Sequence, residues 1–253
     1  MPPERQASPP LRVEAERQAI LPLRLEAVTL RMGRTTLLED IDFRLTAGPC
    51  TVVLGPNGSG KTQLLRICDG LVAPTSGRVV WEGPAAARAA EARALVFQRP
   101  VLLRRSAAAN IDYALRLRGL PSQERARRIE RVLTDTRLAD LADRPARRLS
   151  IGEQQRLALA RAWALEPAVL FLDEPASALD PGSTGALESA IRTIRGEGTK
   201  IVMTTHDLAQ AQRMADEVLF LDDGRLLEQT AAADFFAEPE TAPARKFLRG
   251  EIL

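Results

Sequence analysis

Eight consecutive residues carry the strongest chemical signal in the sequence, the run Gly55-Pro56-Asn57-Gly58-Ser59-Gly60-Lys61-Thr62. This run fits the G-x-x-x-x-G-K-[ST] pattern of a phosphate-binding loop in full. Glycines let the backbone curve so that its N–H groups converge on phosphate oxygens, and a helix that follows directs its positive end at the same anion. We expect Lys61 to reach the β- and γ-phosphates of a nucleotide and the Thr62 hydroxyl to bind Mg²⁺. The alternative, a glycine-rich turn without a ligand, is disfavoured because the run lies between a predicted strand and a predicted helix.

Two acidic residues form the second candidate group. Asp173 and Glu174 directly follow the apolar run Val169–Leu172, which predicts a fully buried strand. Ligands bind at the carboxyl ends of strands in open α/β sheets. We expect Asp173 to hold Mg²⁺ through water and Glu174 to polarise an attacking water. The alternative is a surface turn with two solvated acids, and the phosphate loop upstream argues against it.

Strands and helices alternate along the chain around these residues. Apolar and alternating runs predict strands, at Leu23–Leu30, Ile41–Leu45, Thr51–Leu54, Gly77–Glu82, Ala94–Phe97, Val169–Leu172, Lys200–Thr204, Glu217–Leu221 and Arg225–Leu227. Helical periodicity and end signals predict helices, at Lys61–Asp69, Arg125–Thr134, Glu153–Leu165, Ser183–Arg195 and Leu208–Met214. A further helix is capped by Ser106 and ends at Gly119. This order predicts an α/β core with a mainly parallel sheet, an antiparallel part near the N-terminus, and a helical subdomain inserted over residues 100–150.

Composition limits the function classes. The 253 residues suit one domain, expected over residues 21–253, after a flexible extension over residues 1–20. The 35 basic and 33 acidic residues give a net charge of +2, which offers no case for nucleic-acid binding. Cys50 and Cys68 lack the spacing of a metal site or disulfide pair. No apolar stretch approaches the roughly 20 residues that cross a bilayer, so a membrane role requires a partner.

Further motifs fall in the order seen in ATP-binding cassette (ABC) ATPases, which the chain resembles from about Leu23 to Leu227. Gln98 follows a predicted strand, like the glutamine of the family's Q-loop. The run Leu149-Ser150-Ile151-Gly152-Glu153-Gln154-Gln155-Arg156 resembles the signature motif, and Ser177-Ala178-Leu179-Asp180 resembles the D-loop. His206, the one histidine of the sequence, stands where the family has its switch histidine.

The resemblance implies ATP and Mg²⁺ as ligands, bound between two copies of the chain arranged head to tail. It implies nucleotide contacts within one copy from Met32, Gly55, Pro56, Asn57, Gly58, Ser59, Gly60, Lys61, Thr62 and Gln63. It implies contacts across the interface from Ser150, Gly152, Glu153 and Asp180. The implied catalytic residues are Lys61, Gln98, Glu174 and His206, and the implied metal ligands are Thr62, Gln98 and Asp173.

Three positions depart from the family pattern. Met32 stands where an aromatic ring usually stacks on adenine, and a thioether can still pack on a purine face. Ile151 replaces a signature glycine, which would be strained if that position required a positive φ. Ala176 replaces the usual threonine after Asp173-Glu174-Pro175, with a small packing effect expected. None of the three removes a charged or proton-transferring group, so we expect ATPase activity.

The resemblance further implies a role in bacterial uptake. The segment after Leu227 in this sequence is shorter than the regulatory domain of sugar-type importers, and we expect neither that domain nor a fused membrane domain. We therefore expect a separate subunit at the cytoplasmic face of the inner membrane, acting on a permease and, indirectly, a solute-binding protein. Gln98–Ser106, Asn110–Leu115 and Thr204–Leu208 are similar to segments of tungstate-uptake ATPases. They favour tungstate or molybdate as cargo, with phosphate, polar amino acids or another anion open.

Two other classes stay open. One is a non-transport ATPase whose ATP-driven pairing switches a soluble protein. The other is a nucleotide-binding regulator without turnover, which the presence of both Glu174 and His206 disfavours.

Overall fold

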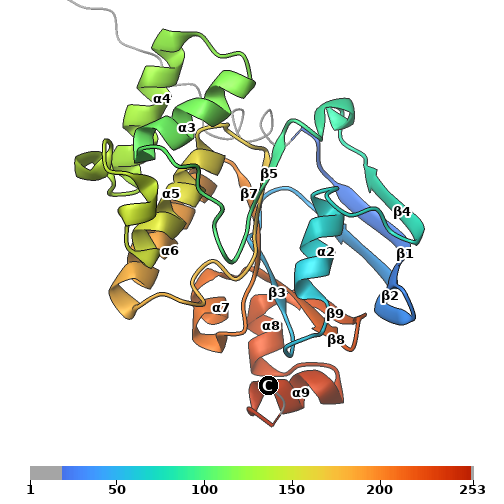
Figure 1. The fold of residues 1–253 in the computed structure, drawn as a ribbon. Helices are drawn as coiled ribbons and strands as arrows, with labels where there is room; N and C mark the ends of the chain where they lie inside the picture. Colours follow the sequence, from blue (N-terminus) through green and yellow to red (C-terminus); the bar gives the residue numbers. More distant parts are fainter. Residues whose placement is uncertain (1–18, 252–253) are drawn as a thin grey trace, which may run out of the picture.

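The computed structural model describes residues 19–251 (Figure 1). Most of the expected N-terminal extension, residues 1–18, lies outside the described part. Ile20, assigned to that extension from sequence, is buried in a hydrophobic core, and the carbonyl oxygen of Ala19 accepts a hydrogen bond of 2.9 Å from the N–H of Ala85. The packed part of the chain therefore already includes these two residues.

The larger sheet has six strands in the order β5-β6-β7-β3-β8-β9. The first five are parallel, and β9 pairs with β8 in the antiparallel direction. Their bounds are β3 Thr51–Leu54, β5 Arg93–Val96, β6 Val169–Leu172, β7 Lys200–Thr204, β8 Glu217–Asp222 and β9 Arg225–Ala231. The smaller sheet is antiparallel, in the order β2-β1-β4, with β1 Leu23–Met32, β2 Thr35–Leu45 and β4 Ser76–Trp81. The α/β fold with a mainly parallel sheet and an N-terminal antiparallel part is confirmed.

Figure 1 shows where the helices lie relative to the two sheets. One helix, α2 (Lys61–Cys68), lies between the two sheets. At the upper left, α3 (Ala107–Leu117) and α4 (Ser122–Asp135) form the predicted helical subdomain, and Ser106 caps α3 as expected by accepting from the N–H of Ala109. The remaining helices are α5 Ile151–Trp163, α6 Pro181–Gly196, α7 Leu208–Met214, α8 Ala232–Ala237 and α9 Ala242–Leu248. Within residues 19–251, no helix is long and apolar enough to cross a bilayer.

Apolar side chains on the two faces of the parallel sheet enter two separate cores. In β6, Leu170 and Leu172 join the core that contains α5 and α6, whereas Val169 and Phe171 join the core beneath α2 and the smaller sheet. Successive side chains of a strand point to opposite faces, so a strand covered on both sides is buried along its whole length and is mostly apolar. This pattern explains why the bounds of β3, β6 and β7 match the sequence prediction.

Two strands, β2 and β9, are much longer than their sequence pattern indicated, whereas β1 and β8 are longer by two residues and by one residue. The predicted strand Ile41–Leu45 is the second half of β2, whose first half is mostly exposed and polar. The predicted strand Arg225–Leu227 continues to Ala231 as β9, because its backbone pairs with β8 along residues whose side chains alternate irregularly. Both extensions come from pairing with a neighbouring strand, which the pattern of one strand does not show. Cys50 and Cys68 are buried free thiols, as expected.

Lys200 is a buried charge at the start of β7. It is fully buried, and its Nζ donates to the Thr51 hydroxyl at 2.8 Å and to the carbonyl oxygen of Pro49. Burial lowers the pKa of Lys200 to about 8, from an ordinary value of 10.5, although the negative charge of Glu217 acts in the opposite direction. Between these two pH values the unfolded chain binds more protons than the folded one, so folding stability rises with pH.

We predict that Lys200→Met removes this pH dependence. From pH 8 to pH 9, the stability of the wild type relative to the variant should rise by up to about 1.4 kcal/mol per pH unit, measured by urea unfolding. Lys246→Met, at an exposed position of α9, is the control and should leave the profile unchanged. Parallel profiles for wild type and Lys200→Met would contradict the prediction.

Candidate functional site

The phosphate loop connects the end of β3 to the start of α2. Gly60 is the residue before α2 and has a φ of 100°. A Cβ at Gly60 would lie 2.9 Å from the carbonyl oxygen of Leu37 and 2.7 Å from Cδ2 of Leu38. Only glycine fits this turn without strain. The turn at Gly60 therefore leads the loop directly into the N-terminus of α2, which favours an anion.

Lys61 is held inside this loop. Its side chain is buried, and Nζ donates to the carbonyl oxygens of Gly55 at 2.7 Å and Pro56 at 2.8 Å. Burial lowers the pKa of Lys61, and the negative charges of Glu174 and Asp173 act against that shift. An ammonium bound to two neutral carbonyls is well placed to exchange them for phosphate oxygens, which offer a stronger charge-assisted bond.

Asp173 lies directly after β6 and faces α2. Its buried carboxylate accepts two hydrogen bonds at Oδ1, from the Thr62 hydroxyl at 2.8 Å and from the Thr204 hydroxyl at 3.0 Å. The predicted pair Thr62 and Asp173 is thus in direct contact. A hydroxyl and a carboxylate are hard oxygen ligands of the kind that Mg²⁺ uses.

Glu174 brings two other predicted residues to the same place. Its Oε2 lies 3.2 Å from Nε2 of Gln98 and 3.1 Å from Nδ1 of His206. Its backbone has a φ of 41°, an uncommon conformation for a residue with a side chain, and its N–H donates to the Thr204 hydroxyl at 2.8 Å. Residues from three loops, after β5, β6 and β7, therefore converge on one carboxylate.

A hollow of about 270 Å³ lies over the loop and reaches Glu174, lined by Leu37, Asn57, Gly58, Gly60, Lys61, Thr62, Gln63 and Glu174. Next to this lining, the buried hydroxyl of Ser59 is the one buried side-chain polar atom among the described residues without a hydrogen-bond partner. An unpaired donor beside a buried ammonium fits a phosphate oxygen. The described residues contain no cluster of three or more acidic, His or Cys side chains fit to hold a metal. A metal here therefore needs nucleotide oxygens besides Thr62 and Asp173, as Mg²⁺ commonly does.

Met32 is not brought into this hollow. It ends β1 with 62% of its surface exposed, and Leu37 of β2 lines the hollow instead. Sequence reasoning missed Leu37 because its position beside the hollow depends on the β1–β2 turn. No motif in the sequence around Leu37 indicates that position.

The residues predicted to serve a second copy lie at two other helix N-termini. Ser150 and Glu153 form a capping box at α5, with Oγ of Ser150 accepting at 3.3 Å and Oε2 of Glu153 at 2.7 Å. Asp180 caps α6 by accepting from the N–H of Ser183 at 2.9 Å. None of these residues lines the hollow over the phosphate loop. Ile151 has helical rather than positive φ and is 61% exposed, so the possible strain noted from sequence is absent.

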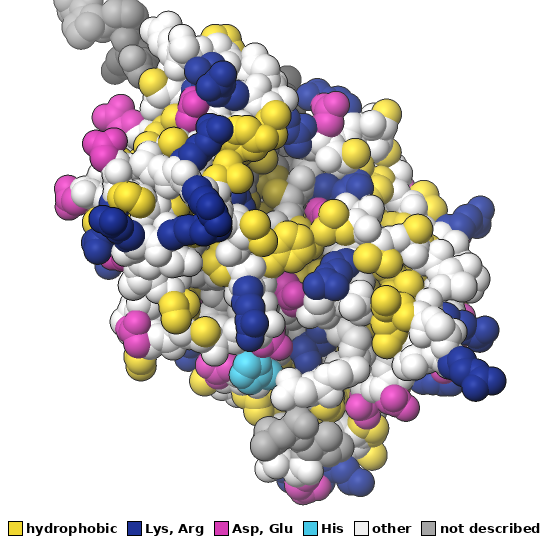
Figure 2. Space-filling model, viewed as in Figure 1, with side chains coloured by type: hydrophobic (Ala, Val, Ile, Leu, Met, Phe, Trp, Pro, Cys, Tyr) yellow, Lys and Arg dark blue, Asp and Glu magenta, His cyan; other side chains and the backbone are white. Residues whose placement is uncertain are grey.

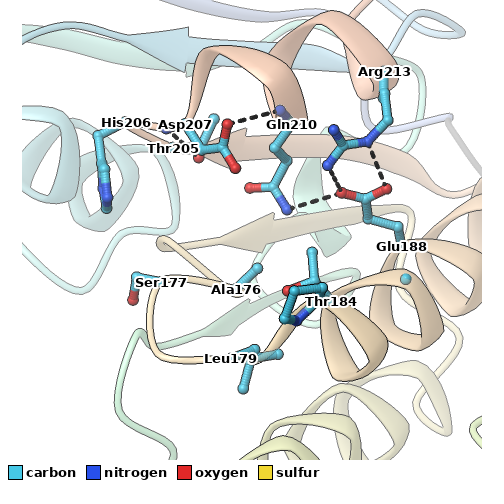
Figure 3. A pocket seen from close by; sticks show the side chains of 12 residues that line it. Ala176, Ser177, Leu179, Thr184, Glu188, Thr205, His206, Asp207, Gln210 and Arg213 are labelled. Atoms are coloured by element: carbon cyan, nitrogen blue, oxygen red, sulfur yellow. Dashed lines mark hydrogen bonds and ion pairs between the residues drawn. The ribbon is translucent and has the colours of Figure 1, made fainter.

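A second hollow, of about 540 Å³, lies beside His206 and includes Ala176 and Ser177 (Figure 3). Its floor holds Glu188 of α6, which sequence reasoning did not single out. Arg213 of α7 binds both oxygens of Glu188, at 2.7 and 3.2 Å, and Gln210 donates at 3.3 Å. Burial alone would raise the pKa of Glu188, but these bonds hold it below its usual range. The pair ties the helix after the D-loop-like segment to the helix after His206.

Comparison with known proteins gives consistent matches. The family model described as ABC transporter matches residues 38–177. The methionine import ATP-binding protein MetN of Nocardia farcinica is 39% identical over 84% of this chain and 67% of its own length. The phosphate import ATP-binding protein PstB 2 of Natronomonas pharaonis is 36% identical over 87% of this chain and 83% of its own. Among solved structures, cbiO1 of Clostridium perfringens, part of the ABC transporter complex cbiONQ, matches with a TM-score of 0.76 and 29% identity, covering 91% of this chain and 98% of that one.

We predict that Gly152→Ala destabilises the protein because α5 and α6 approach closely at this residue. A Cβ at Gly152 would lie 2.6 Å from Oγ and 2.8 Å from Cβ of Ser183. Overpacking of this kind costs about 1–3 kcal/mol, measurable by urea unfolding. Adding Ser183→Gly removes both opposing atoms and should recover most of the loss relative to Ser183→Gly alone. Equal stability of Gly152→Ala and wild type would contradict the close approach.

Proposed function

Because this chain belongs to the ABC transporter family, as an ATPase of the import type, we propose that it hydrolyses ATP to energise uptake of a small solute through a separate permease. One observation carries the proposal. Thr62 of the phosphate loop contacts Asp173, and the adjacent Glu174 contacts both Gln98 and His206. These residues come from four loops and meet at one edge of the sheet.

Binding of ATP uses the loop and its lysine. The backbone N–H groups of Gly58 to Thr62 and the Ser59 hydroxyl bind phosphate oxygens, and Lys61 releases its two carbonyl partners to do the same. Thr62 and Asp173 would hold Mg²⁺, with Gln98 as a further oxygen ligand. When bound, Mg²⁺ neutralises charge on the β- and γ-phosphates.

Hydrolysis is assigned to Glu174. Its carboxylate orients a water and takes the water's proton as the water oxygen bonds to the γ-phosphorus. The bond from that phosphorus to the β–γ bridging oxygen breaks, and its electron pair leaves with ADP. His206 and Gln98 lie within hydrogen-bond distance of Oε2 of Glu174, so they fix the direction of the base. Both side chains would also lie close to the attacking water and the γ-phosphate. Lys61 stabilises the charge of the transferred phosphoryl group.

A second copy of the chain would complete the site. Ser150, Gly152, Glu153 and Asp180 lie away from the phosphate-loop hollow, at the N-termini of α5 and α6. A helix N-terminus favours an anion, so α5 of one copy suits the γ-phosphate bound to the other. The capping box leaves the Ser150 hydroxyl able to donate a hydrogen bond, since it acts there as an acceptor.

The permease would dock beside Gln98. A largely apolar groove of about 170 Å³ is formed by β5, the segment after it, α3 and α5, and hydrophobic side chains gather where the helical subdomain meets the core (Figure 2). Val101 on its rim is 69% exposed. Arg161 is the one charged residue in the lining, and its guanidinium makes no hydrogen bond or ion pair with the described residues. Burial lowers the pKa of its guanidinium. An apolar helix with an acidic side chain fits this groove.

A structural change caused by nucleotide binding would be transmitted to that groove through Gln98 and α5. The amide of Gln155 in α5 donates to the carbonyl oxygen of Phe97 at 3.4 Å, next to Gln98. We infer that the described residues, 19–251, act as one ATPase domain, with residues 100–150 as an inserted helical subdomain that moves with the Q-loop. The site of action would be the cytoplasmic face of the bacterial inner membrane, with a solute-binding protein acting on the far side.

For the cargo we propose an oxyanion, tungstate or molybdate. The segments similar to tungstate-uptake ATPases support it, and one relative is named for phosphate import. Another relative is named for methionine import, so an amino acid is the competing cargo. The ATPase does not touch the cargo, so transport assays with each solute decide between them.

A switch that acts on a soluble partner is the alternative function. A neighbouring gene that encodes several apolar spans of roughly 20 residues supports transport, and a soluble neighbour supports the switch.

We predict that Glu174→Gln abolishes turnover while nucleotide binding remains. Loss of a general base lowers the rate by about 10² to 10⁴, because glutamine keeps the shape of the side chain and loses the proton acceptor. With ATP and without Mg²⁺, the variant should shift from monomer to dimer in size-exclusion chromatography with light scattering, and ADP should not cause the shift.

Glu166→Gln is the matched control for this substitution. Glu166 also has a positive φ, 51°, and it pairs with Arg128 and Arg131 away from the phosphate loop. The Glu166→Gln variant should keep wild-type turnover. Wild-type turnover in Glu174→Gln would exclude Glu174 as the base, and a monomer with every nucleotide would count against the two-copy site.

A further inference from the structure

Thr204 is a buried residue that links the two acids of the site. It ends β7, which pairs with β6 on one side and β3 on the other, and it is 0% exposed. Its hydroxyl donates to Oδ1 of Asp173 at 3.0 Å and accepts from the N–H of Glu174 at 2.8 Å. The Thr204 hydroxyl therefore donates its single proton to Asp173, the proposed metal ligand, and accepts a hydrogen bond from the backbone of Glu174, the proposed base.

The bond to Asp173 fixes which carboxylate oxygen is free. Oδ1 accepts from both Thr204 and Thr62, so Oδ2 is the oxygen without a hydrogen bond to the described residues. Partners that fix the orientation of a metal-ligating carboxylate commonly change metal affinity or activity by 10- to 100-fold when removed.

The bond to Glu174 supports an unusual backbone. The φ of 41° at Glu174 is disfavoured for a residue with a Cβ, and such a conformation persists only where the surroundings hold it. The Thr204 hydroxyl is the hydrogen-bond partner of that N–H, and this conformation directs the Glu174 side chain to Gln98 and His206.

We propose that Thr204 is a positioning residue for ATP hydrolysis, which orients Asp173 toward the metal and Glu174 toward the attacking water without touching the nucleotide. This inference rests on the proposed function. A purely structural role, in which the hydroxyl only satisfies buried polar groups, would affect stability alone. The two roles are separable because valine keeps the branched shape of threonine and removes the hydroxyl, whereas serine keeps the hydroxyl.

The test compares Thr204→Val and Thr204→Ser in the full chain. Binding of Mn²⁺, as a probe for Mg²⁺, is measured by electron paramagnetic resonance with a non-hydrolysable ATP analogue bound. We expect Thr204→Val to weaken Mn²⁺ binding about tenfold or more and to lower kcat by a similar factor, with little change in the metal-free affinity for the analogue. Thr204→Ser should stay within about threefold of wild type, below the range that loss of such a partner produces.

Thr199→Val controls for the loss of a buried threonine hydroxyl. Thr199 precedes the opposite end of β7, and its hydroxyl donates to the carbonyl oxygen of Pro167 at 2.9 Å. This control should lose stability in urea unfolding and keep wild-type Mn²⁺ affinity and kcat.

Mn²⁺ affinity and kcat in Thr204→Val equal to wild type would overturn the positioning role. An equal loss in Thr199→Val would overturn it too, since general destabilisation would then explain both. Failure of the proposed function looks different: the wild type itself would bind neither the analogue nor Mn²⁺ with it.

Discussion

The hydrogen bond between Thr62 and Asp173 is the contact on which the rest of the site depends. It joins the first turn of α2 to the end of β6, two elements separated by more than a hundred residues of chain. The contact exists because β3, β7 and β6 are neighbours in one parallel sheet and end at the same edge. Parallel strands bring their carboxyl ends together, so the phosphate loop, the acidic pair and His206 emerge side by side.

The packing on both faces of the sheet keeps this edge in place. One core joins the sheet to α5 and α6, and the other joins it to α2 and the antiparallel sheet. A rigid edge suits a reaction that depends on positioning and electrostatic stabilisation. The segment with Gln98 reaches this edge through hydrogen bonds from Gln98 to Glu174 and Ser177. The helices α3 and α4 of the helical subdomain pack into the same core as α5 and α6.

Much of this architecture follows from the sequence, for reasons that differ between residues. The bounds of β3, β6 and β7 were predicted because strands buried on both faces carry mostly apolar or β-branched side chains, with Lys200 at the start of β7 as an exception. Lys61, Thr62 and Asp173 were predicted because glycines and a strand end constrain where phosphate and metal chemistry can occur.

Other features depend on contacts between distant segments and have no local signal. In the sequence, Thr204 looks like any other β-branched strand residue. Its contacts with the site arise only from the pairing of β7 with β6. In the sequence, Glu188 looks like a solvated helix residue. Its ion pair with Arg213 depends on the position of α7, which is distant in the chain. The concern about Ile151 came from assuming a glycine conformation, whereas the capping box makes Ile151 an ordinary first residue of α5.

Calorimetric titration of ATP into the wild type and into Lys61→Met, with Mg²⁺ and with a chelator, tests the nucleotide site most directly. Saturable binding that is stronger with Mg²⁺ in the wild type and lost in Lys61→Met is the predicted result, because Lys61 and the Thr62–Asp173 pair act on the same phosphates. Absence of ATP binding by the wild type, or equal binding by Lys61→Met, would contradict the assignment of this edge of the sheet as the ATP site.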